Sequence, residues 1–263
     1  MPEADRQERH NRQMRLQNWG KEGQRAIEKA RVLVVGCGGL GAPVIQYLAG
    51  AGVGAITLMD DDRVELSNLN RQLLHREADI NRLKSERAKE WVTALDPSIE
   101  VRALSSRLTP ENGRETVQNF DMVFDCTDGF ASKFLLNDCC VLEQVPLIHG
   151  AVSGYAGQWM IINGGGQPCV RCLFETIPQQ RQGESCQEMG VLGAACGVIG
   201  SSMALHGLLL MATGTSDLVG YFNTCDLSAG AQRNIKISQH IDCSACGQDP
   251  EIDGRDPEDY RPI

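Results

Sequence analysis

The sequence lacks an excess of positive charge. Its 263 residues include 25 Lys and Arg against 34 Asp and Glu, which gives a formal net charge of −9 at pH 7. Proteins that track the phosphates of a nucleic acid need a basic face, so this balance argues against such a function. A local basic site is compatible with the composition, but it has to form against the negative electrostatic potential of the whole protein.

The sequence also lacks an apolar leader and a long apolar run. Its first ten residues, M-P-E-A-D-R-Q-E-R-H, are polar, so no secretory signal is predicted. The most apolar segment, residues 198–212, is shorter than the ~20 residues that span a bilayer and contains His206. Eleven cysteines, an odd number, fit free, buried or metal-bound thiols in a reducing compartment. We therefore expect a cytoplasmic protein.

The first half of the chain alternates between strands and helices. Short apolar runs rich in β-branched residues predict buried strands, and segments with helical apolar spacing lie between them. This order predicts an α/β fold with a doubly wound, mostly parallel, Rossmann-like sheet. The predicted strands cover residues 32–35, 55–60, 99–104, 122–126 and 146–149, and the predicted helices cover residues 40–51, 84–95, 110–119 and 131–142.

The second half of the chain has a different pattern. Residues 154–163 alternate like an antiparallel strand, and two further strands are predicted at 219–222 and 235–237. The apolar stretch at 193–212 predicts a helix that is buried in the core or at a subunit contact. The polar segment at 175–190 predicts an irregular loop. We therefore expect antiparallel C-terminal strands to extend the parallel sheet.

These patterns divide the chain into three parts. Residues 1–30 are polar and charged and predict an N-terminal arm or helix. Residues 31–248 form the main domain, with the doubly wound half at 31–150 and a second half at 151–248. The acidic, proline-bearing tail at 249–263 is predicted to be disordered.

A glycine loop follows the first predicted strand. Residues 36–41, G-C-G-G-L-G, match G-x-G-x-x-G before a predicted helix, so backbone N–H groups can approach a phosphate at the helix N-terminus. Asp60 ends the next predicted strand, where its carboxylate can accept a hydrogen bond from a ribose. Together they predict that 31–150 binds a nucleotide, and on this evidence alone an NAD-dependent oxidoreductase is the simpler interpretation. The loop glycines are Gly36, Gly38, Gly39 and Gly41.

Two cations follow the acidic residue and favour a different nucleotide chemistry. Asn70, Arg71 and Gln72 come soon after Asp60, and Lys84 opens the next predicted helix. An enzyme that attacks the α-phosphate of ATP needs cations, because the triphosphate and an incoming carboxylate repel one another. The alternative is that Arg71 and Lys84 are solvated surface charges. As a group behind this loop, they favour an ATP site.

Another acidic motif lies at the carboxyl end of a predicted strand. D-C-T-D-G at residues 125–129 stands at the edge where open α/β sheets bind their ligands. Asp128 could hold Mg²⁺ that bridges phosphates. The alternative is that Asp125 or Asp128 only caps the helix that begins near Phe130.

The cysteines include two C-x-x-C pairs. Cys169 with Cys172 and Cys243 with Cys246 predict a closed, tetrahedral, structural Zn²⁺ site, provided that the fold brings the distant pairs together. One redox dithiol and one accidental pair is the alternative. Cys186 lies in the polar loop and is the single candidate for covalent sulfur chemistry.

In combination these motifs resemble the ThiF/MoeB/HesA family, bacterial relatives of the ubiquitin-activating enzymes. The resemblance runs from about Arg9 to Gly247, nearly the whole chain. One departure is Gly129, where the family usually has Asn. The motifs in family order are H-N-R-Q-M-R-L (10–16), G-C-G-G-L-G (36–41), S-N-L-N-R-Q (67–72), Lys84, D-C-T-D (125–128) and both cysteine pairs.

The resemblance implies a homodimer that uses Mg²⁺ and ATP to adenylate the C-terminal Gly-Gly carboxylate of a small ubiquitin-like sulfur-carrier protein. By position, Gly39 and Gly41 match the phosphate loop and Asp60 matches the ribose-binding acid. The other matches are Asn70, Arg71 and Lys84 to phosphate contacts, Asp128 to the magnesium ligand, Arg12 to an arginine that enters the neighbouring subunit's site, the four paired cysteines to zinc ligands, and Cys186 to a loop cysteine that links covalently to the carrier.

The resemblance also gives residues 151–248 the role of a zinc-stapled, carrier-binding half. The segments at 60–72, 79–85 and 106–109 look more like the thiamine branch, whose carrier is ThiS-like, than the molybdopterin branch. A MoeB-like molybdopterin-synthase carrier adenylyltransferase is the alternative, ahead of the oxidoreductase. A sulfurtransferase or cysteine desulfurase is the expected sulfur-donating partner.

Overall fold

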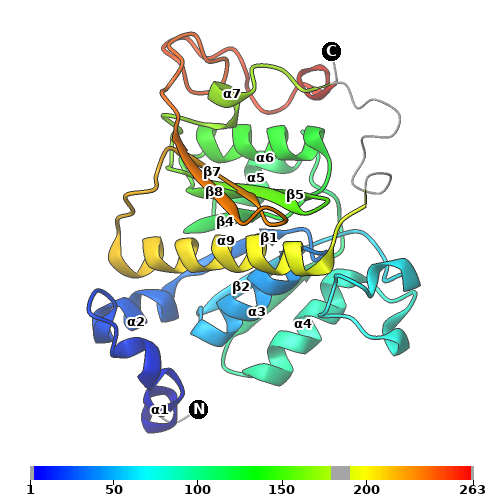
Figure 1. The fold of residues 1–263 in the computed structure, drawn as a ribbon, viewed down its shortest axis with the longest axis vertical. Coiled ribbons are helices and arrows are strands. Elements are labelled where there is room, and N and C mark those ends of the chain that lie inside the picture. Colours follow the sequence, from blue (N-terminus) through cyan, green and yellow to red (C-terminus); the bar gives the residue numbers. More distant parts are fainter. Residues whose placement is uncertain (1–2, 179–189, 262–263) are drawn as a thin grey trace.

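One eight-stranded sheet runs through the protein, whose computed structural model describes residues 3–178 and 190–261 (Figure 1). The strand order is β3-β2-β1-β4-β5-β6-β7-β8; the first five are parallel and the rest pair antiparallel. The predicted fold class is confirmed. The strands are β1 (Arg31–Val35), β2 (Ala55–Met59), β3 (Glu100–Leu104), β4 (Met122–Asp125), β5 (Leu147–Ser153), β6 (Ala156–Ile162), β7 (Tyr221–Asp226) and β8 (Ala231–Lys236).

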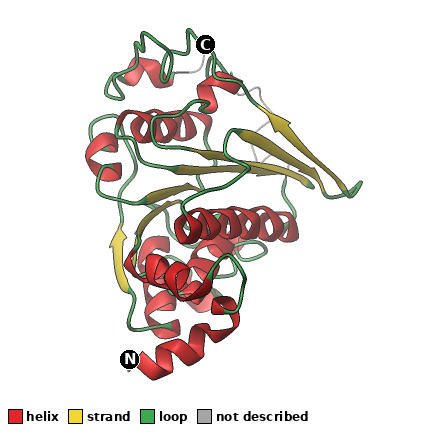
Figure 2. Cartoon of the chain, turned by 90° about the vertical axis from the view of Figure 1, so that its left-hand side faces the viewer, coloured by secondary structure: helices red, strands yellow, loops and turns green. Residues whose placement is uncertain are grey.

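Helices cover both faces of the sheet (Figures 1 and 2). One face carries α3, α4 and α9, with α2 packed on α9, and the other carries α6, with α5 packed on it. The helices are α1 (Glu3–Met14), α2 (Gly20–Lys29), α3 (Gly41–Ala51), α4 (Lys84–Leu95), α5 (Gly113–Val117), α6 (Phe130–Leu142), α7 (Val170–Leu173) and α9 (Gly193–Thr213). Short 3-10 helices lie at Leu66–Asn68 (η1), Glu77–Asp79 (η2) and Pro257–Tyr260 (η3).

The central strands are apolar on both sides because helices lie on both sides. In β1, Val32 and Val34 join the core under α3 and α9, while Leu33 and Val35 join the core under α6. Successive side chains of a strand point to opposite faces, so a continuous β-branched run is what two helical layers require.

Helix α9 is the longest described helix and belongs to the helical layer that also contains α3. Among the described helices, α9 alone is long and apolar enough to cross a membrane, judged by length and composition. It has 21 residues, so it is longer than the most apolar segment of the sequence, at 198–212. In the fold it packs against α3, β5 and β6, as a core helix does. Its glycines permit close contact, because a Cβ on Gly207 would overlap the ring of Phe124 and one on Gly200 would lie 2.6 Å from the carbonyl oxygen of Leu40.

The chain ends and the last strands differ from the expectations. The predicted arm at 1–30 forms two helices. The tail expected to be disordered is ordered through residue 261, because buried Ile252 and Tyr260 add apolar surface and η3 packs on α6. The two last strands, predicted at 219–222 and 235–237, lie instead at Tyr221–Asp226 and Ala231–Lys236. β8 is exposed along its whole length, so its sequence has no apolar pattern that would mark its bounds.

The helix predicted at 110–119 is shorter than expected. It covers only α5, and the segment before it is held by Asn112, whose Oδ1 accepts a hydrogen bond from the backbone N–H of Thr109 at 2.9 Å. Asn112 is the N-cap residue of α5, and its side chain also fixes the backbone of Thr109 before the helix.

The close packing of α9 can be tested with two glycines of the same helix. Gly207→Ala is expected to lower the free energy of unfolding by about 1–3 kcal/mol, because its Cβ would overlap the fully buried Phe124. At Gly197 nothing lies within 4 Å of a new Cβ, so Gly197→Ala should raise the free energy by up to ~1 kcal/mol through better helix propensity. Urea unfolding measures both, and equal effects of the two changes would contradict this packing.

Candidate nucleotide and zinc sites

The glycine loop at 36–41 joins the carboxyl end of β1 to α3. Gly36 has a φ of 97°, and a Cβ there would lie 2.5 Å from the carbonyl oxygen of Cys126, just after β4. A Cβ on Gly41 would overlap the carbonyl oxygen of Gly36. These two glycines close the turn against the neighbouring strand. The N-terminus of α3 therefore stands at the carboxyl edge of the sheet, where free N–H groups favour an anion.

Gly38 and Gly39 face two side chains instead. A Cβ on Gly38 would lie 3.5 Å from Nε2 of Gln72, and one on Gly39 would lie 3.5 Å from Cγ of Arg71. Gln72 is 4% exposed, and its Oε1 has no hydrogen-bond partner among the described residues. A buried amide with an unmet hydrogen bond fits a site that a polar ligand completes. The structure thus places Gln72 and Arg71 beside the loop.

Asp60 follows β2 and ties the loop to that strand. Its Oδ2 accepts a hydrogen bond from the backbone N–H of Cys37 at 2.7 Å, and its Oδ1 accepts one from that of Asp62 at 2.9 Å. Burial raises the pKa of this carboxyl above its ordinary value. Each carboxylate oxygen can accept a second hydrogen bond, so Asp60 can hold the loop and still bind a ribose hydroxyl.

Lys84 is the first residue of α4 and is buried beside this acid. It is 6% exposed, its Nζ donates to Oδ2 of Asp62 at 2.8 Å, and its charge opposes the effect of burial on the pKa of Asp60. The hydroxyl of Ser85 donates to the backbone oxygen of Asp60 at 3.0 Å and fixes the start of the helix. The alternative that Lys84 is a solvated surface charge is wrong.

Arg71 is half-buried beside Gly39 of the loop. Its Nη1 donates to the backbone oxygen of Ser67 at 2.9 Å and to Oδ1 of the exposed Asn70 at 3.1 Å. Gly193, at the start of α9, packs on this segment, since a Cβ there would lie 3.2 Å from Cα of Arg71. A guanidinium has five N–H donors. Within the described part of the chain, no hydrogen bond engages its Nε or Nη2, which leaves them for a ligand.

A buried charge cluster lies under the motif at 125–129. Nζ of Lys133 is 3.3 Å from Oδ2 of Asp125 and donates to the carbonyl oxygen of Gly150 at 2.5 Å. Nδ1 of His149 lies 2.7 Å from the same Oδ2, and the hydroxyl of Thr127 donates to Oδ1 at 2.7 Å. Burial alone would raise the pKa of Asp125, but Lys133, His149 and Thr127 hold it well below its usual value. Asp125 is therefore an anchor of the loop.

Asp128 is exposed at the rim of a cavity of about 520 Å³. Neither it nor Asp125 caps α6, whose N-cap is Gly129 without a side-chain hydrogen bond, so the capping alternative is wrong. The cavity adjoins the glycine loop through Leu40. It is lined by Leu40, Thr127, Asp128, Phe130, Lys133, Ala151, Val152, Ser153, Ala156, Gly157, Gln158, Thr224, Cys225, Asp226, Ala231 and Arg233.

Three residues of the site belong to no motif and were missed from the sequence. His75 is buried with Nε2 3.2 Å from the carbonyl oxygen of Cys37, and burial lowers its pKa, which keeps the ring neutral at pH 7. Lys133 and His149 hold Asp125. The available signals were a lysine inside the apolar helix predicted at 131–142 and a histidine that ends the strand predicted at 146–149.

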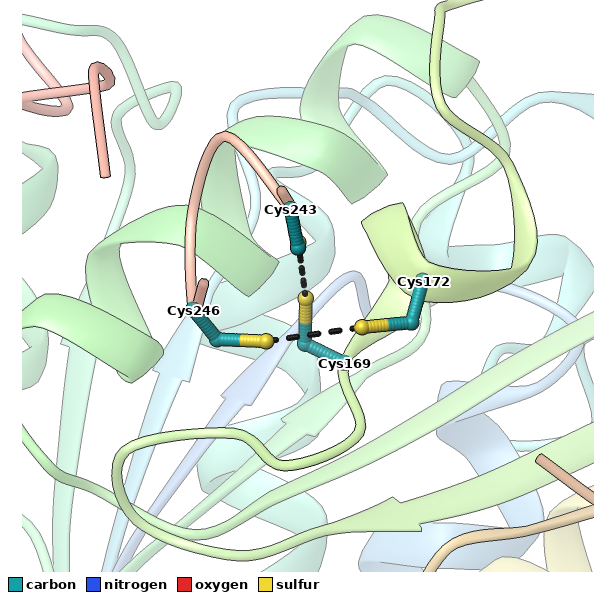
Figure 3. Close-up of side chains that lie close together, drawn as sticks. All are labelled: Cys169, Cys172, Cys243 and Cys246. Atoms are coloured by element: carbon teal, nitrogen blue, oxygen red, sulfur yellow. Dashed lines mark hydrogen bonds between the residues drawn. The ribbon is translucent and has the colours of Figure 1, made fainter. Parts of the chain in front are cut away.

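The four paired cysteines meet, although about seventy residues separate the pairs (Figure 3). Sγ of Cys169 lies 3.7 Å from that of Cys243, and Sγ of Cys172 lies 3.4 Å from that of Cys246. All four Sγ atoms lie within 4.8 Å of one another. Tetrahedral zinc with Zn–S bonds of ~2.3 Å places its sulfurs ~3.8 Å apart, so this cluster fits a closed zinc site. The alternative of one redox dithiol and one accidental pair does not explain this convergence.

Two candidate residues are not brought to the site. Arg12 is exposed in the last turn of α1, which is fastened to the far end of α3 by a hydrogen bond from Nε2 of Gln13 to the backbone oxygen of Ala51 at 2.9 Å. The glycine loop of the same chain lies at the N-terminal end of α3, whereas α1 is bound at the C-terminal end. Arg12 therefore lies away from that loop. Cys186 lies outside the described residues.

Known proteins similar to this chain come from animals, fungi, plants and bacteria. "Adenylyltransferase and sulfurtransferase MOCS3" of Anopheles gambiae is 40% identical over 245 residues, which cover 93% of this chain and 56% of that protein. "Sulfur carrier protein adenylyltransferase" of Thermus thermophilus is 38% identical over 248 residues, which cover 92% of both chains. The chain thus spans little more than half the length of the MOCS3 relatives and nearly all of the Thermus one.

Solved structures share the fold at lower identity. Escherichia coli MccB with ATP has a TM-score of 0.76 and 21% identity, covering 86% of this chain and 69% of that one. PaaA has a TM-score of 0.74 and 19% identity, covering 91% of this chain and 76% of that one. The ThiF family matches residues 10–245, nearly the whole chain. This protein therefore belongs to the ThiF family.

Proposed function

We propose that this protein uses ATP to adenylate the C-terminal Gly-Gly carboxylate of a small ubiquitin-like sulfur-carrier protein. The observation that carries the proposal is the position of two cations near the glycine loop: Lys84 is buried beside Asp60, and Arg71 lies beside Gly39. The relatives named as adenylyltransferases support it, above all the Thermus protein of matching length. The glycine loop alone would fit either NAD or ATP, and the two cations near it favour ATP.

The proposed chemistry needs positioning and charge neutralisation rather than a proton relay. The carrier's carboxylate is ionised at neutral pH, so its oxygen attacks the α-phosphorus directly and pyrophosphate leaves. Arg71 and Lys84 stabilise the negative charge that gathers on the α-phosphate. Asp128 is the carboxylate that would hold Mg²⁺, which neutralises the pyrophosphate when bound. In a homodimer, Arg12 would be free to reach the partner's site.

The carrier's pathway is a separate part of the proposal. The names of the relatives support the MoeB-like alternative better than the thiamine branch that the motifs at 60–72, 79–85 and 106–109 favour. We therefore place the protein among sulfur-carrier adenylyltransferases without a thiamine assignment. Cys186 stays a candidate for a covalent link to the carrier, with a sulfurtransferase or cysteine desulfurase as the sulfur donor.

The cysteine cluster is proposed to hold a structural Zn²⁺. Four thiolates fill a tetrahedral shell and leave no open position for catalysis. The backbone N–H of His240 lies 3.4 Å from Sγ of Cys172 and supports a thiolate there. The metal would join the segment after β6 to the segment after β8, and so fix the hairpin between them.

Removal of either cation is expected to slow adenylation. Arg71→Ala and Lys84→Met should each lower the rate of ATP–pyrophosphate exchange on the order of 10²-fold, because each removes a charge that stabilises the transition state. The assay contains Mg·ATP, labelled pyrophosphate and a sulfur-carrier protein that ends in Gly-Gly. Lys84→Met keeps most of the buried volume, so a loss of exchange without a loss of folded protein separates catalysis from stability.

Lys89→Ala, on the same helix as Lys84, is the matched control and should leave exchange unchanged. Unaltered exchange in both Arg71→Ala and Lys84→Met would contradict the proposal. NAD-dependent turnover of another substrate by the unmodified protein, with no exchange of labelled pyrophosphate, would favour the oxidoreductase.

Loss of the metal is expected to loosen the second half of the chain. The purified protein should contain about one zinc ion per chain by elemental analysis, and Cys243→Ser should lower that content and the melting temperature, because binding energy contributes to folding. Cys225→Ser changes a cysteine outside the cluster and should keep the zinc. Full zinc content in Cys243→Ser, or none in the unmodified protein, would overturn the zinc assignment.

A further inference from the structure

The cavity beside Asp128 has a floor built from one face of the antiparallel strands. The pairing register places Ala151, Gln158, Thr224 and Arg233 in one row across β5, β6, β7 and β8. In each strand, the residue two positions from the first row belongs to a second, parallel row, which contains Ser153, Ala156, Asp226 and Ala231. Residues two apart share a face, so both rows point to the same side of the sheet. All eight residues line the cavity.

This floor faces away from α9. The row between these two contains Gly157 and Cys225, and a Cβ on Gly157 would overlap Ile199 of α9. The cavity rows therefore lie on the α6 side, where Phe130 and Lys133 form the wall next to Asp128. The floor runs from the nucleotide site at β5 to the open edge of the sheet at β8.

Arg233 differs from the other charged groups of the cavity. Lys133 is paired with Asp125, and the carboxylate of Asp226 accepts hydrogen bonds from Ser228 and Ala229 in the β7–β8 turn. The guanidinium of Arg233 is exposed and has no ion pair or hydrogen bond within the described residues. The rest of the two rows is small or neutral. Arg233 is therefore an unpaired cation at the outer end of a floor whose other charged residue, Asp226, is held by the β7–β8 turn.

We infer that Arg233 selects the carrier's tail, by binding an acidic side chain that lies a few residues before the terminal glycine. This inference rests on the proposed function, because it takes the carrier's carboxyl terminus to lie beside Asp128. β8 is the last strand, and the strands of this end of the sheet project past the helices, so a tail that enters from the edge crosses Arg233 first (Figure 2). A guanidinium recognises a carboxylate through two parallel hydrogen bonds.

The strand spacing predicts which tail residue meets Arg233. Three steps of ~4.8 Å separate β5 from β8, a span of ~14 Å. An extended chain covers ~3.4 Å per residue, so the span takes about four residues. With the terminal glycine at β5, the acidic residue is the fifth from the carrier's end, and the length of the arginine side chain allows the fourth or sixth.

A charge-swap experiment tests this subsite. The probe is a Gly-Gly-ending sulfur-carrier protein that the unmodified enzyme adenylates, prepared with Asp, Asn or Lys at the fifth position from its end. For the Asp tail, Arg233→Glu should raise the KM for the carrier about fivefold or more, because two carboxylates then face each other. For the Lys tail the same change should lower that KM. The KM for ATP should stay the same in all cases.

Arg102→Glu, on the exposed edge strand β3 at the other end of the sheet, is the matched control and should affect all tails equally. Equal effects of Arg233→Glu on the Asp and Lys tails, also when the charge is moved to the fourth or sixth position, would overturn the inference while leaving adenylation intact. A change in the KM for ATP would assign Arg233 to the nucleotide instead. Failure of every Gly-Gly carrier to be adenylated would refute the proposed function itself.

Discussion

The carboxyl ends of three parallel strands meet at one edge, and the site depends on that constraint. Val35 of β1 pairs with Met59 of β2 and with Asp125 of β4, so the segments that follow these strands start side by side. Asp60 then binds the backbone of Cys37 and closes the glycine loop onto β2. Ligands of open α/β sheets bind at this edge because strand ends and helix N-termini converge there.

The charges of the site are held by partners before any ligand binds. Lys84 is buried, and its pair with Asp62 and the nearby Asp60 offset the cost of taking an ammonium out of water. Asp125 is kept ionised by Lys133 and two further partners, so the loop that carries Asp128 has a rigid base. Fixed charges of this kind stabilise developing charge without rearrangement during the reaction. A protein of net charge −9 thereby presents two cations beside its glycine loop.

Sequence patterns predicted the parts of the fold that obey local rules. The β-branched run at 32–35 and the glycines after it gave the first strand and its loop, because a strand between two helical layers must be apolar throughout. The pairing of Cys169–Cys172 with Cys243–Cys246 was also predictable, since thiolate ligands come at fixed spacing. His149 and Lys133 were not, because their roles arise only when β5 and α6 pack against β4. The tail was misjudged because acidic composition hides the few apolar residues, Ile252 and Tyr260, that anchor it.

The two halves of the chain are under different constraints, and the register across the sheet explains why. Under the proposed function, the nucleotide half must keep its glycines and cations in place, because they surround the phosphates of the bound nucleotide. The hairpin β7–β8 is less constrained; β8 is exposed along its length and its main packing neighbour is β7. Its side chains can therefore vary without cost to the core, as those at an exposed edge generally can. A family that activates different carriers with one nucleotide site would place its selectivity on such a strand, and the exposed, unpaired guanidinium of Arg233 on β8 fits that division.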